Sequence, residues 1–278
     1  MKELITRYHS PAITPLELGD LWVGNHILWY AMQEENFPTV LRGVVESLRR
    51  GEGATESDGP IPAIIKYFDS LYVAGGGSQE PGMRAALSAL EFPVSFSRTP
   101  DYPGERGGLS LLAQTGAGWV CDLGQSSFKI CATERMRFER DHQQLPIRTA
   151  QPVESIEGQR RALRDWLSGA LRTFATQCAA PEAMLFALPS RVNDDAVPDA
   201  TSYIGMGGDD TLIVDIIAAA GLKPVAVLVM NDAELAALDA LAEPELKYCE
   251  KTLVLTLGFG LGSALVKRRP PGRVYYGL

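Results

Sequence analysis

The amino-acid sequence predicts an α/β protein built from two domains. Its 278 residues exceed the usual size of one compact core, so two domains of ordinary size are expected. Strand-like runs follow one another at residues 118–123, 128–133 and 135–141, which predicts an antiparallel meander. Helical and strand-like segments alternate after it, so the sheet is expected to be mixed, with helices on its faces.

The first hundred residues predict helices around an apolar strand. Between residues 18 and 50 apolar side chains recur at helical spacing, and Asn36-Phe37-Pro38 supplies a cap residue and an early proline where one helix ends and another begins. Residues 51–60 are expected to form a solvated loop. The segments expected next are a helix at 62–68, a strand at 70–74, a helix at 83–90, a strand at 93–96, a loop at 98–108 and a short helix at 109–114.

The chain alternates between helix and strand after the meander. An amphipathic helix is expected at about 156–178, since apolar residues fall on one face. The later segments are a strand at 184–188, a polar loop to about 210, a helix at 211–220, a strand at 225–230, a helix at 233–241 and strands at 252–257, 264–267 and 274–276. A meander followed by such alternation is typical of a ribonuclease H-like half-domain.

Composition disfavours several classes of function. The formal net charge of −8 argues against nucleic acid as the main partner, because phosphate backbones are held by dense Lys and Arg surfaces. No apolar run approaches the ~20 residues of a membrane span and no secretory signal is apparent, so a cytoplasmic protein is expected. The four cysteines form no CxxC pair and the three histidines lack a partner at metal-ligand spacing, which disfavours zinc chemistry.

The first chemical motif is the turn between the first two meander strands. Its candidate ligands are Asp122, Gly124, Gln125, Ser126, Ser127 and Lys129. A hairpin of this composition can aim amides and hydroxyls at a phosphate, while Asp122 holds Mg²⁺ through water and Lys129 offers a point charge. The alternative interpretation is an ordinary β-turn with a surface lysine.

Two further turns are rich in glycine and follow apolar strands. Their glycines are Gly258, Gly260 and Gly262 in one turn and Gly75, Gly76 and Gly77 in the other. Glycine lets backbone amides approach an anion closely, and the second turn leads into a helix N-terminus, which favours bound anions. The alternatives are a bulged core strand for the first turn and an ordinary strand-to-helix connection for the second.

Asn231 and Asp232 lie between a strand and a helix, where open α/β sheets place their ligands. Asp232 can accept a proton from a substrate hydroxyl as that oxygen attacks phosphorus. The alternative is that Asp232 only caps the helix. Ser190, Arg191 and Asn193 follow another strand and, with Asn231, are candidates to line the acceptor pocket.

Four segments resemble motifs of the sugar kinase, heat-shock protein 70 and actin superfamily. DLGQSSFK is similar to its first phosphate motif, LTLGFGLGSALV to its second and LYVAGGGSQEPGMRAAL to its adenosine motif. VLVMNDAELAAL resembles the strand and helix that carry the catalytic aspartate of ROK-family sugar kinases. The resemblance implies two ribonuclease H-like, actin-like ATPase domains that bind ATP and Mg²⁺ in a cleft between them.

The motif order departs from that of the superfamily, where the adenosine motif follows both phosphate motifs. A circular permutation explains this: residues 1–115 would be the adenosine-motif domain, usually C-terminal, and residues 116–278 the phosphate-motif and catalytic domain. Two further departures concern the ligands. The cysteine-rich zinc motif of ROK proteins is absent, and their sugar-contacting Glu-x-Gly-His is matched only by Glu17-Leu18-Gly19-Asp20, which makes Glu17 the candidate sugar ligand.

The sequence thus predicts an ATP-dependent kinase for a sugar or similar small polyol. Its expected partner is a small-molecule phosphate acceptor, without nucleic acid or membrane, and a homodimer is compatible with the chain. Two alternatives stay open. One is a non-catalytic or slow ATPase that acts as a regulatory scaffold, and the other is activation of an acid through an acyl phosphate.

Overall fold

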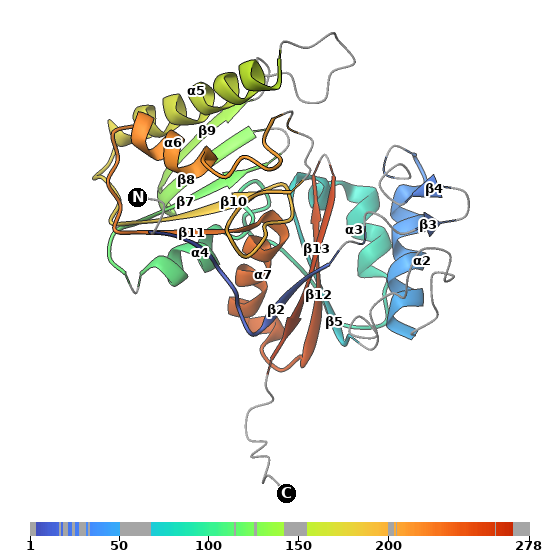
Figure 1. The fold of residues 1–278 in the computed structure, drawn as a ribbon. Coiled ribbons are helices and arrows are strands. Elements are labelled where there is room, and N and C mark those ends of the chain that lie inside the picture. The colour runs from blue at the N-terminus through green and yellow to red at the C-terminus, as the bar shows by residue number, and fades with distance from the viewer. Residues whose placement is uncertain are drawn as a thin grey trace, which may run out of the picture. The chain divides into compact units, whose positions relative to one another are not determined.

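A computed structural model gives the arrangement of most of the chain as two mixed sheets flanked by helices (Figure 1). The described residues are 4–16, 18, 22–23, 26–27, 32, 34–50, 68–113, 115–124, 127–141, 155–199, 203, 205–258 and 260–268. The chain divides into two compact units. Unit 1 comprises Met1–His9 and Glu105–Leu235, and unit 2 comprises Ser10–Gly104 and Ala236–Leu278.

Unit 1 contains a six-stranded sheet in the order β1-β11-β10-β7-β8-β9. Its elements are β1 (Ile5–Arg7), α4 (Glu105–Leu112), β7 (Gly118–Leu123), β8 (Ser127–Thr133), β9 (Met136–Asp141), α5 (Ile156–Ala175), β10 (Ala183–Leu188), α6 (Leu212–Ala219), β11 (Ala226–Asn231) and the first turn of α7 (Asp232–Ala242). β1, β11, β10 and β7 are parallel, while β8 and β9 are antiparallel to their neighbours. The predicted meander is therefore confirmed.

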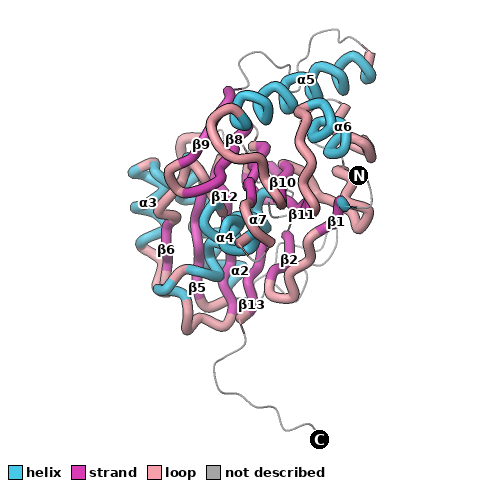
Figure 2. Tube along the Cα trace, turned by 90° about the vertical axis from the view of Figure 1, so that its left-hand side faces the viewer, coloured by secondary structure: helices cyan, strands magenta, loops and turns pink. Residues whose placement is uncertain are grey.

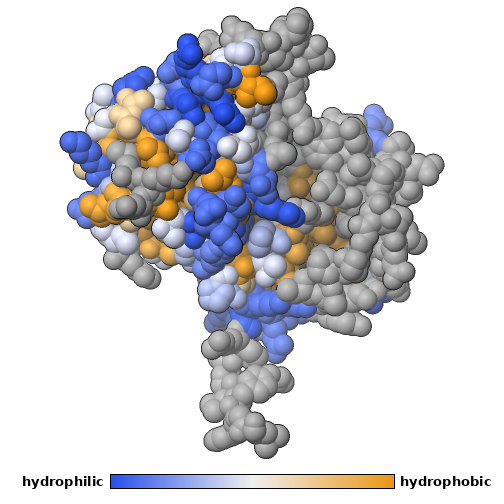
Figure 3. Space-filling model, viewed as in Figure 1, coloured by the Kyte–Doolittle hydropathy of each residue, from blue (hydrophilic) through white to orange (hydrophobic). Residues whose placement is uncertain are grey.

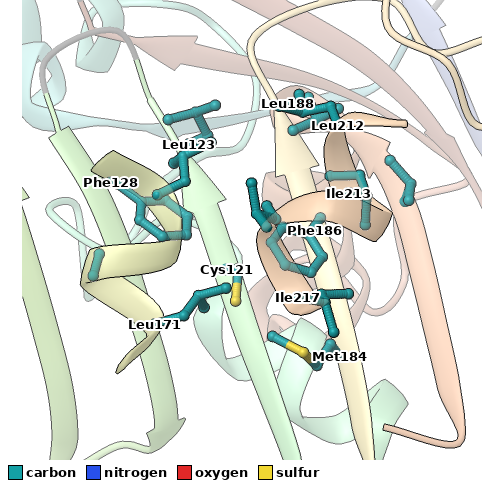
Figure 4. Close-up of a cluster of buried hydrophobic side chains, with 14 of the residues drawn as sticks. Cys121, Leu123, Phe128, Leu171, Met184, Phe186, Leu188, Leu212, Ile213 and Ile217 are labelled. Atoms are coloured by element: carbon teal, nitrogen blue, oxygen red, sulfur yellow. The ribbon is translucent and has the colours of Figure 1, made fainter. Parts of the chain in front are cut away.

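Helices cover both faces of the unit 1 sheet. Side chains alternate along a strand, so β7 and β10 turn one set of apolar residues towards α5 and α6 (Figure 4). The packed residues include Cys121, Leu123, Leu171, Phe186, Leu188, Ile213 and Ile217. On the opposite face α4 lies so close that a Cβ on Gly108 would approach Val120 to 2.9 Å. By the same alternation, Asp122 points to the α4 face.

Unit 2 contains a five-stranded sheet in the order β2-β13-β12-β5-β6 (Figure 2). Its elements are β2 (Ile13–Leu16), β3 (Trp22–Val23), β4 (His26–Ile27), α2 (Phe37–Arg50), β5 (Ser70–Ala74), the 3₁₀-helix η3 (Gly76–Gln79), α3 (Pro81–Ser88), β6 (Val94–Phe96), the rest of α7, η4 (Pro244–Leu246), β12 (Lys251–Leu257) and β13 (Leu261–Lys267). β5 is parallel to β6 and β12, and the β12–β13 hairpin continues antiparallel to β2.

The core of unit 2 lies between this sheet and the helices α2 and α3. Phe37, Leu41, Val45 and Leu48 recur along α2 at helical spacing, and all four are buried. They join Met83 and Leu87 of α3 and apolar residues of β5, β12 and β13 in one cluster. The glycine loops that follow β5 and β12 therefore extend from strands anchored in this core.

Most of the predicted elements are confirmed, but the loop predicted at 98–108 is wrong in part, because α4 begins at Glu105, and a second region also differs. The strands predicted at 70–74 and 118–123 match β5 and β7. Helical spacing was read from residue 18 onward, but Trp22–Val23 and His26–Ile27 pair as antiparallel strands, and the described helix of this region is α2, from Phe37. The predicted segments at 62–67 and 274–276 lie outside the described residues.

The two units differ from the contiguous domains expected on either side of residue 115. β12 pairs in parallel with β5, so that Thr252 to Thr256 lie opposite Ser70 to Ala74. The β12–β13 hairpin therefore belongs to the unit 2 sheet, with β5, and not to the unit 1 sheet that contains Asp122. The division falls inside α7, between Leu235 and Ala236.

No helix among the described residues is long and apolar enough to cross a membrane. On the face drawn in Figure 3, hydrophilic and hydrophobic residues of the described surface are interspersed. Large apolar side chains that are well exposed include Leu4, Ile156, Val225 and Tyr248, scattered over different elements. Isolated apolar residues of this kind are normal on protein surfaces.

Candidate active site

Three parallel strands end at the same edge of the unit 1 sheet. β10 lies between the other two, with Ala187 opposite Asp122 of β7 and Leu188 opposite Asn231 of β11. The carboxyl ends of parallel strands meet at one edge, so Asp122 and Asp232 flank the end of β10. The negative charge of Asp122 contributes to raising the pKa of Asp232, as expected for carboxyl groups at neighbouring strand ends. The structure thus brings together the predicted magnesium ligand and the predicted base.

Both carboxyl groups are harder to ionise than usual. Burial raises the pKa of Asp122 from 3.8 to about 6, with Lys129 opposing the rise and Glu139 adding to it. Burial and the negative charge of Asp122 raise the pKa of Asp232 from 3.8 to about 7. A carboxyl group that titrates near neutral pH can exchange a proton with a substrate.

The first loop is built more tightly than its sequence suggested. The Gly124 amide donates to the Ser127 carbonyl (3.0 Å) and Tyr203 donates to the Gly124 carbonyl (2.5 Å). The Ser127 hydroxyl donates to Glu139 (2.5 Å), and Lys129 lies opposite Asp122 in the register of β7 and β8. The Gly124 amide and the Ser127 hydroxyl, both predicted phosphate ligands, are therefore already bonded within the protein.

Asn231, and not Asp232 alone, caps α7. Its side-chain oxygen accepts the backbone N–H of Ala233 (2.9 Å), while its own backbone N–H donates to the Glu234 carboxylate (2.9 Å). This reciprocal pattern is a capping box. Asp232 also accepts the Ala233 amide (2.8 Å). Asp232 and Asn231 thus share the capping of α7, as the alternative interpretation of Asp232 expected.

The loop after β10 is tied to Asn231 through its backbone. The Asn231 amide group donates to the carbonyls of Leu188 (3.3 Å) and Ser190 (2.9 Å). The Ser190 hydroxyl donates to the Arg191 carbonyl (2.7 Å), and the Asn193 side chain accepts the Val197 amide (2.9 Å). Ser190 and Asn193 therefore shape the loop, while Arg191 is exposed beside it.

The two glycine turns of unit 2 lie side by side. Gly75 has a φ of +84°, and a Cβ there would come within 2.3 Å of the Leu257 carbonyl, directly before Gly258. Gly77 packs against Leu257 as well, whereas Gly76 and Gly258 face open space. The Gly258 amide donates to the Gly260 carbonyl (3.1 Å), and Gly262 already pairs with Thr256 inside the hairpin. The backbone at Gly76 and Gly258 thus has open space beside it, although the Gly258 amide is already bonded within its turn.

Some predicted residues are not described, and other residues were missed. Gln125, Ser126 and Glu17 lie outside the described residues. Sequence reasoning missed Tyr203, Glu139 and Glu234 at the unit 1 edge. The Asn-x-x-Glu spacing of Asn231 and Glu234 is a capping-box signal that could have found Glu234. Tyr203 and Glu139 carry no such local signal, because tertiary structure alone brings them to the loop.

A separate apolar pocket of about 510 Å³ lies at the other end of the unit 1 sheet. Leu112, Trp119, Met136 and Cys178 are among the residues that line it. Gly118 and Trp119 begin β7, whereas Asp122 stands near its end. The pocket includes none of the predicted site residues.

The acidic pair suits a cation shared with a substrate. Among the described residues, no group of three or more His, Cys, Asp or Glu side chains could hold a metal ion. Mg²⁺ commonly takes only one or two carboxylates, with water and substrate phosphates as its other ligands. Asp122 and Asp232 repel each other at a partly buried edge, so a divalent cation there would relieve their repulsion.

Comparisons with known proteins leave the relationship of this chain open. A scan against models of protein families found no match, and a search of curated proteins found no significant relative. The functional argument therefore depends on the residues and their geometry.

Proposed function

We propose that this protein is an ATP-dependent phosphotransferase that phosphorylates a hydroxyl of a sugar or similar small polyol. The observation that carries the proposal is the pair Asp122 and Asp232 at the carboxyl edge of β7 and β11, with pKa values raised to about 6 and about 7. Asn231 and Asp232 both accept the Ala233 amide, so α7 would keep a cap while Asp232 takes part in chemistry. Its pKa lies near the value that suits a general base at neutral pH.

In this proposal each unit has its own role. Asp232 accepts the proton of the acceptor hydroxyl while that oxygen bonds to the γ-phosphorus, and ADP leaves as the bond to its β-phosphate oxygen breaks. Asp122 would help to hold Mg²⁺, which neutralises phosphate charge when bound. In unit 2, backbone at Gly76 and Gly258 would approach the nucleotide.

Matching sheet topologies support a relationship to the actin-like superfamily. In unit 1 the order β9-β8-β7-β10-β11 combines an antiparallel meander with two parallel strands, and β2-β13-β12-β5-β6 repeats this combination in unit 2. The proposed phosphate loops occupy the equivalent hairpins, β7–β8 and β12–β13. Two ribonuclease H-like domains with a permuted strand order would account for this repetition.

The proposal is tested by following ADP release from ATP and Mg²⁺ with a panel of hexoses, pentoses, polyols and carboxylic acids. Release that requires a hydroxyl acceptor and stops in Asp232→Asn supports the kinase. Release that depends on a carboxylic acid would replace it with acyl phosphate formation. Slow release that ignores every acceptor, or none at all, would contradict the kinase and favour the regulatory scaffold.

A further inference from the structure

The N-terminal strand β1 reaches the candidate active site through a buried ion pair. β1 is the edge strand of unit 1 and pairs in parallel with β11, so that Arg7 lies opposite Val229 (Figure 2). The Arg7 guanidinium donates to both oxygens of Glu234, at 2.7 and 2.6 Å. The two side chains are only 5% and 7% exposed, so the pair is well shielded from water. Both bonds come from Nη2, while Nε and Nη1 donate to backbone carbonyls, so every nitrogen of the guanidinium is held in place.

The same two residues touch both segments that form the acceptor side of the site. Arg7 Nε donates to the Val192 carbonyl (3.1 Å), in the loop after β10. The Glu234 carboxylate accepts the backbone N–H of Asn231 (2.9 Å), the residue directly before Asp232. Asn231 in turn donates to the Ser190 carbonyl (2.9 Å). The bonds close a ring from β1 through α7 and the β10 loop.

We propose that Arg7 and Glu234 are positioning residues that hold Asp232 and the Ser190–Val192 segment in register for the acceptor. The proposal rests on the proposed function. Neither side chain needs to touch substrate, since Arg7 acts through Glu234 and through the backbone of the loop. A buried pair that tied only two elements together would stabilise the fold, whereas this one also links two groups assigned to one reaction.

The structure offers a matched control in the same unit. Arg137 of β9 binds a buried glutamate as well, donating from Nε and Nη2 to Glu105 of α4 at 2.6 to 3.0 Å. The Arg137 and Glu105 side chains are 32% and 2% exposed, and this ion pair joins β9 to α4, neither of which carries Asp122, Asn231 or Asp232. Arg7→Lys and Arg137→Lys keep the positive charge but lose the guanidinium fork.

The first readout needs no activity. Hydrogen exchange followed by NMR should show the Asn231 amide exchanging about 10-fold faster in Arg7→Lys than in wild type, because its acceptor Glu234 is no longer fixed. The β8 amides should keep their protection, and Arg137→Lys should leave Asn231 unchanged. Equal exchange rates of the Asn231 backbone amide in wild type and Arg7→Lys would overturn the proposed positioning role of Arg7.

The second readout separates positioning from stability. With ATP, Mg²⁺ and a mixed panel of hexoses, Arg7→Lys should lower kcat about 10-fold or more with the KM for ATP within about twofold, since misplaced reacting groups slow the chemical step. Glu234→Gln, which keeps an oxygen for the Asn231 amide, should fall between Arg7→Lys and wild type. Arg137→Lys should keep the wild-type kcat.

The outcomes distinguish the two proposals. If wild type releases no ADP, the proposed function fails, and with it the positioning role of Arg7 and Glu234 in catalysis. Hydrogen exchange still shows whether Arg7 fixes the Asn231 backbone. If wild type is active and Arg7→Lys and Arg137→Lys lose kcat equally, the Arg7 pair is only structural and the inference is wrong.

Discussion

The two units carry different side chains at equivalent positions of the same arrangement of strands. Asp122 is the penultimate residue of β7, and the equivalent position of β12 is Thr256. Asp232 directly follows β11, and the residue that directly follows β6 is Ser97. Where unit 1 has carboxylates, unit 2 therefore has hydroxyls.

Under the proposed function, this difference would give the two units different tasks. Unit 1 holds like charges at a partly buried edge, which costs stability and raises the pKa of both groups. Unit 2 instead brings two glycine turns into contact through Gly75 and Leu257, which exposes backbone without placing charge. We expect acid–base chemistry in unit 1 and neutral, backbone-mediated binding in unit 2.

The largest expected effect is on turnover, when the charge of unit 1 is removed. Asp232→Asn should lower acceptor-dependent ADP release by about 10³-fold, because general base catalysis commonly contributes 10²- to 10⁴-fold. A coupled assay for ADP measures this loss. Ser97→Ala, the matched change in unit 2, should stay within about threefold of wild type, and equal losses in both variants would remove the proposed division of labour.

The next effect is on the stability of unit 2. Gly75→Ala should lower the free energy of unfolding by about 2–4 kcal/mol, since an L-residue is strained at positive φ and the new Cβ would meet the Leu257 carbonyl. Urea unfolding gives the value. Gly43→Ala is the control, because α2 has open space there and alanine should stabilise the helix by roughly 0.5–1 kcal/mol. Equal stability of both variants would mean that the two glycine turns are not packed together.

A smaller effect concerns the pH dependence of unit 1. Asp122 and Asp232 have folded-state pKa values above 3.8, so the folded protein binds more protons than the unfolded chain between about pH 4 and pH 7. Their contribution to stability therefore falls as the pH rises through this window. Asp122→Asn should remove part of this fall and raise the free energy of unfolding at pH 7 by about 2 kcal/mol.

Urea unfolding at several pH values tests this effect. A variant that is less stable than wild type at pH 7, with an unchanged pH slope, would show that the acidic pair carries no repulsion. Thr256→Ala in unit 2 should leave the slope unchanged, because a threonine hydroxyl does not titrate in this range.

The sequence predicted local structure well and the pairing of distant segments poorly. Apolar alternation and turn residues located β5, β7 and most later elements almost to the residue. They could not show that β12 pairs with β5 or that β1 pairs with β11, because no local pattern encodes such partners. The expected contiguous division therefore differs from the two units.

The candidate site was predictable from the sequence only where residue type and position relative to a strand indicate a chemical role. Asp122 and Asp232 stand at strand ends, and a strand end is visible in the sequence. The use of the Gly124 amide and the Ser127 hydroxyl within the turn was not predictable, since it depends on register with Glu139 and on Tyr203. Arg7 is 227 residues from its partner Glu234, so only the folded chain reveals their contact.

The most direct test of the comparison is the affinity for a non-hydrolysable ATP analogue with Mg²⁺, measured by calorimetry. Gly76→Ala and Gly258→Ala add a methyl group into open space, so they should fold normally yet weaken binding by about 10-fold, because the ligand would lose close approach to the backbone. Asp232→Asn and Gly43→Ala should bind within about twofold of wild type. Wild-type affinity in both glycine variants, with binding lost in Asp232→Asn, would contradict the assignment of nucleotide binding to unit 2 and of chemistry to unit 1.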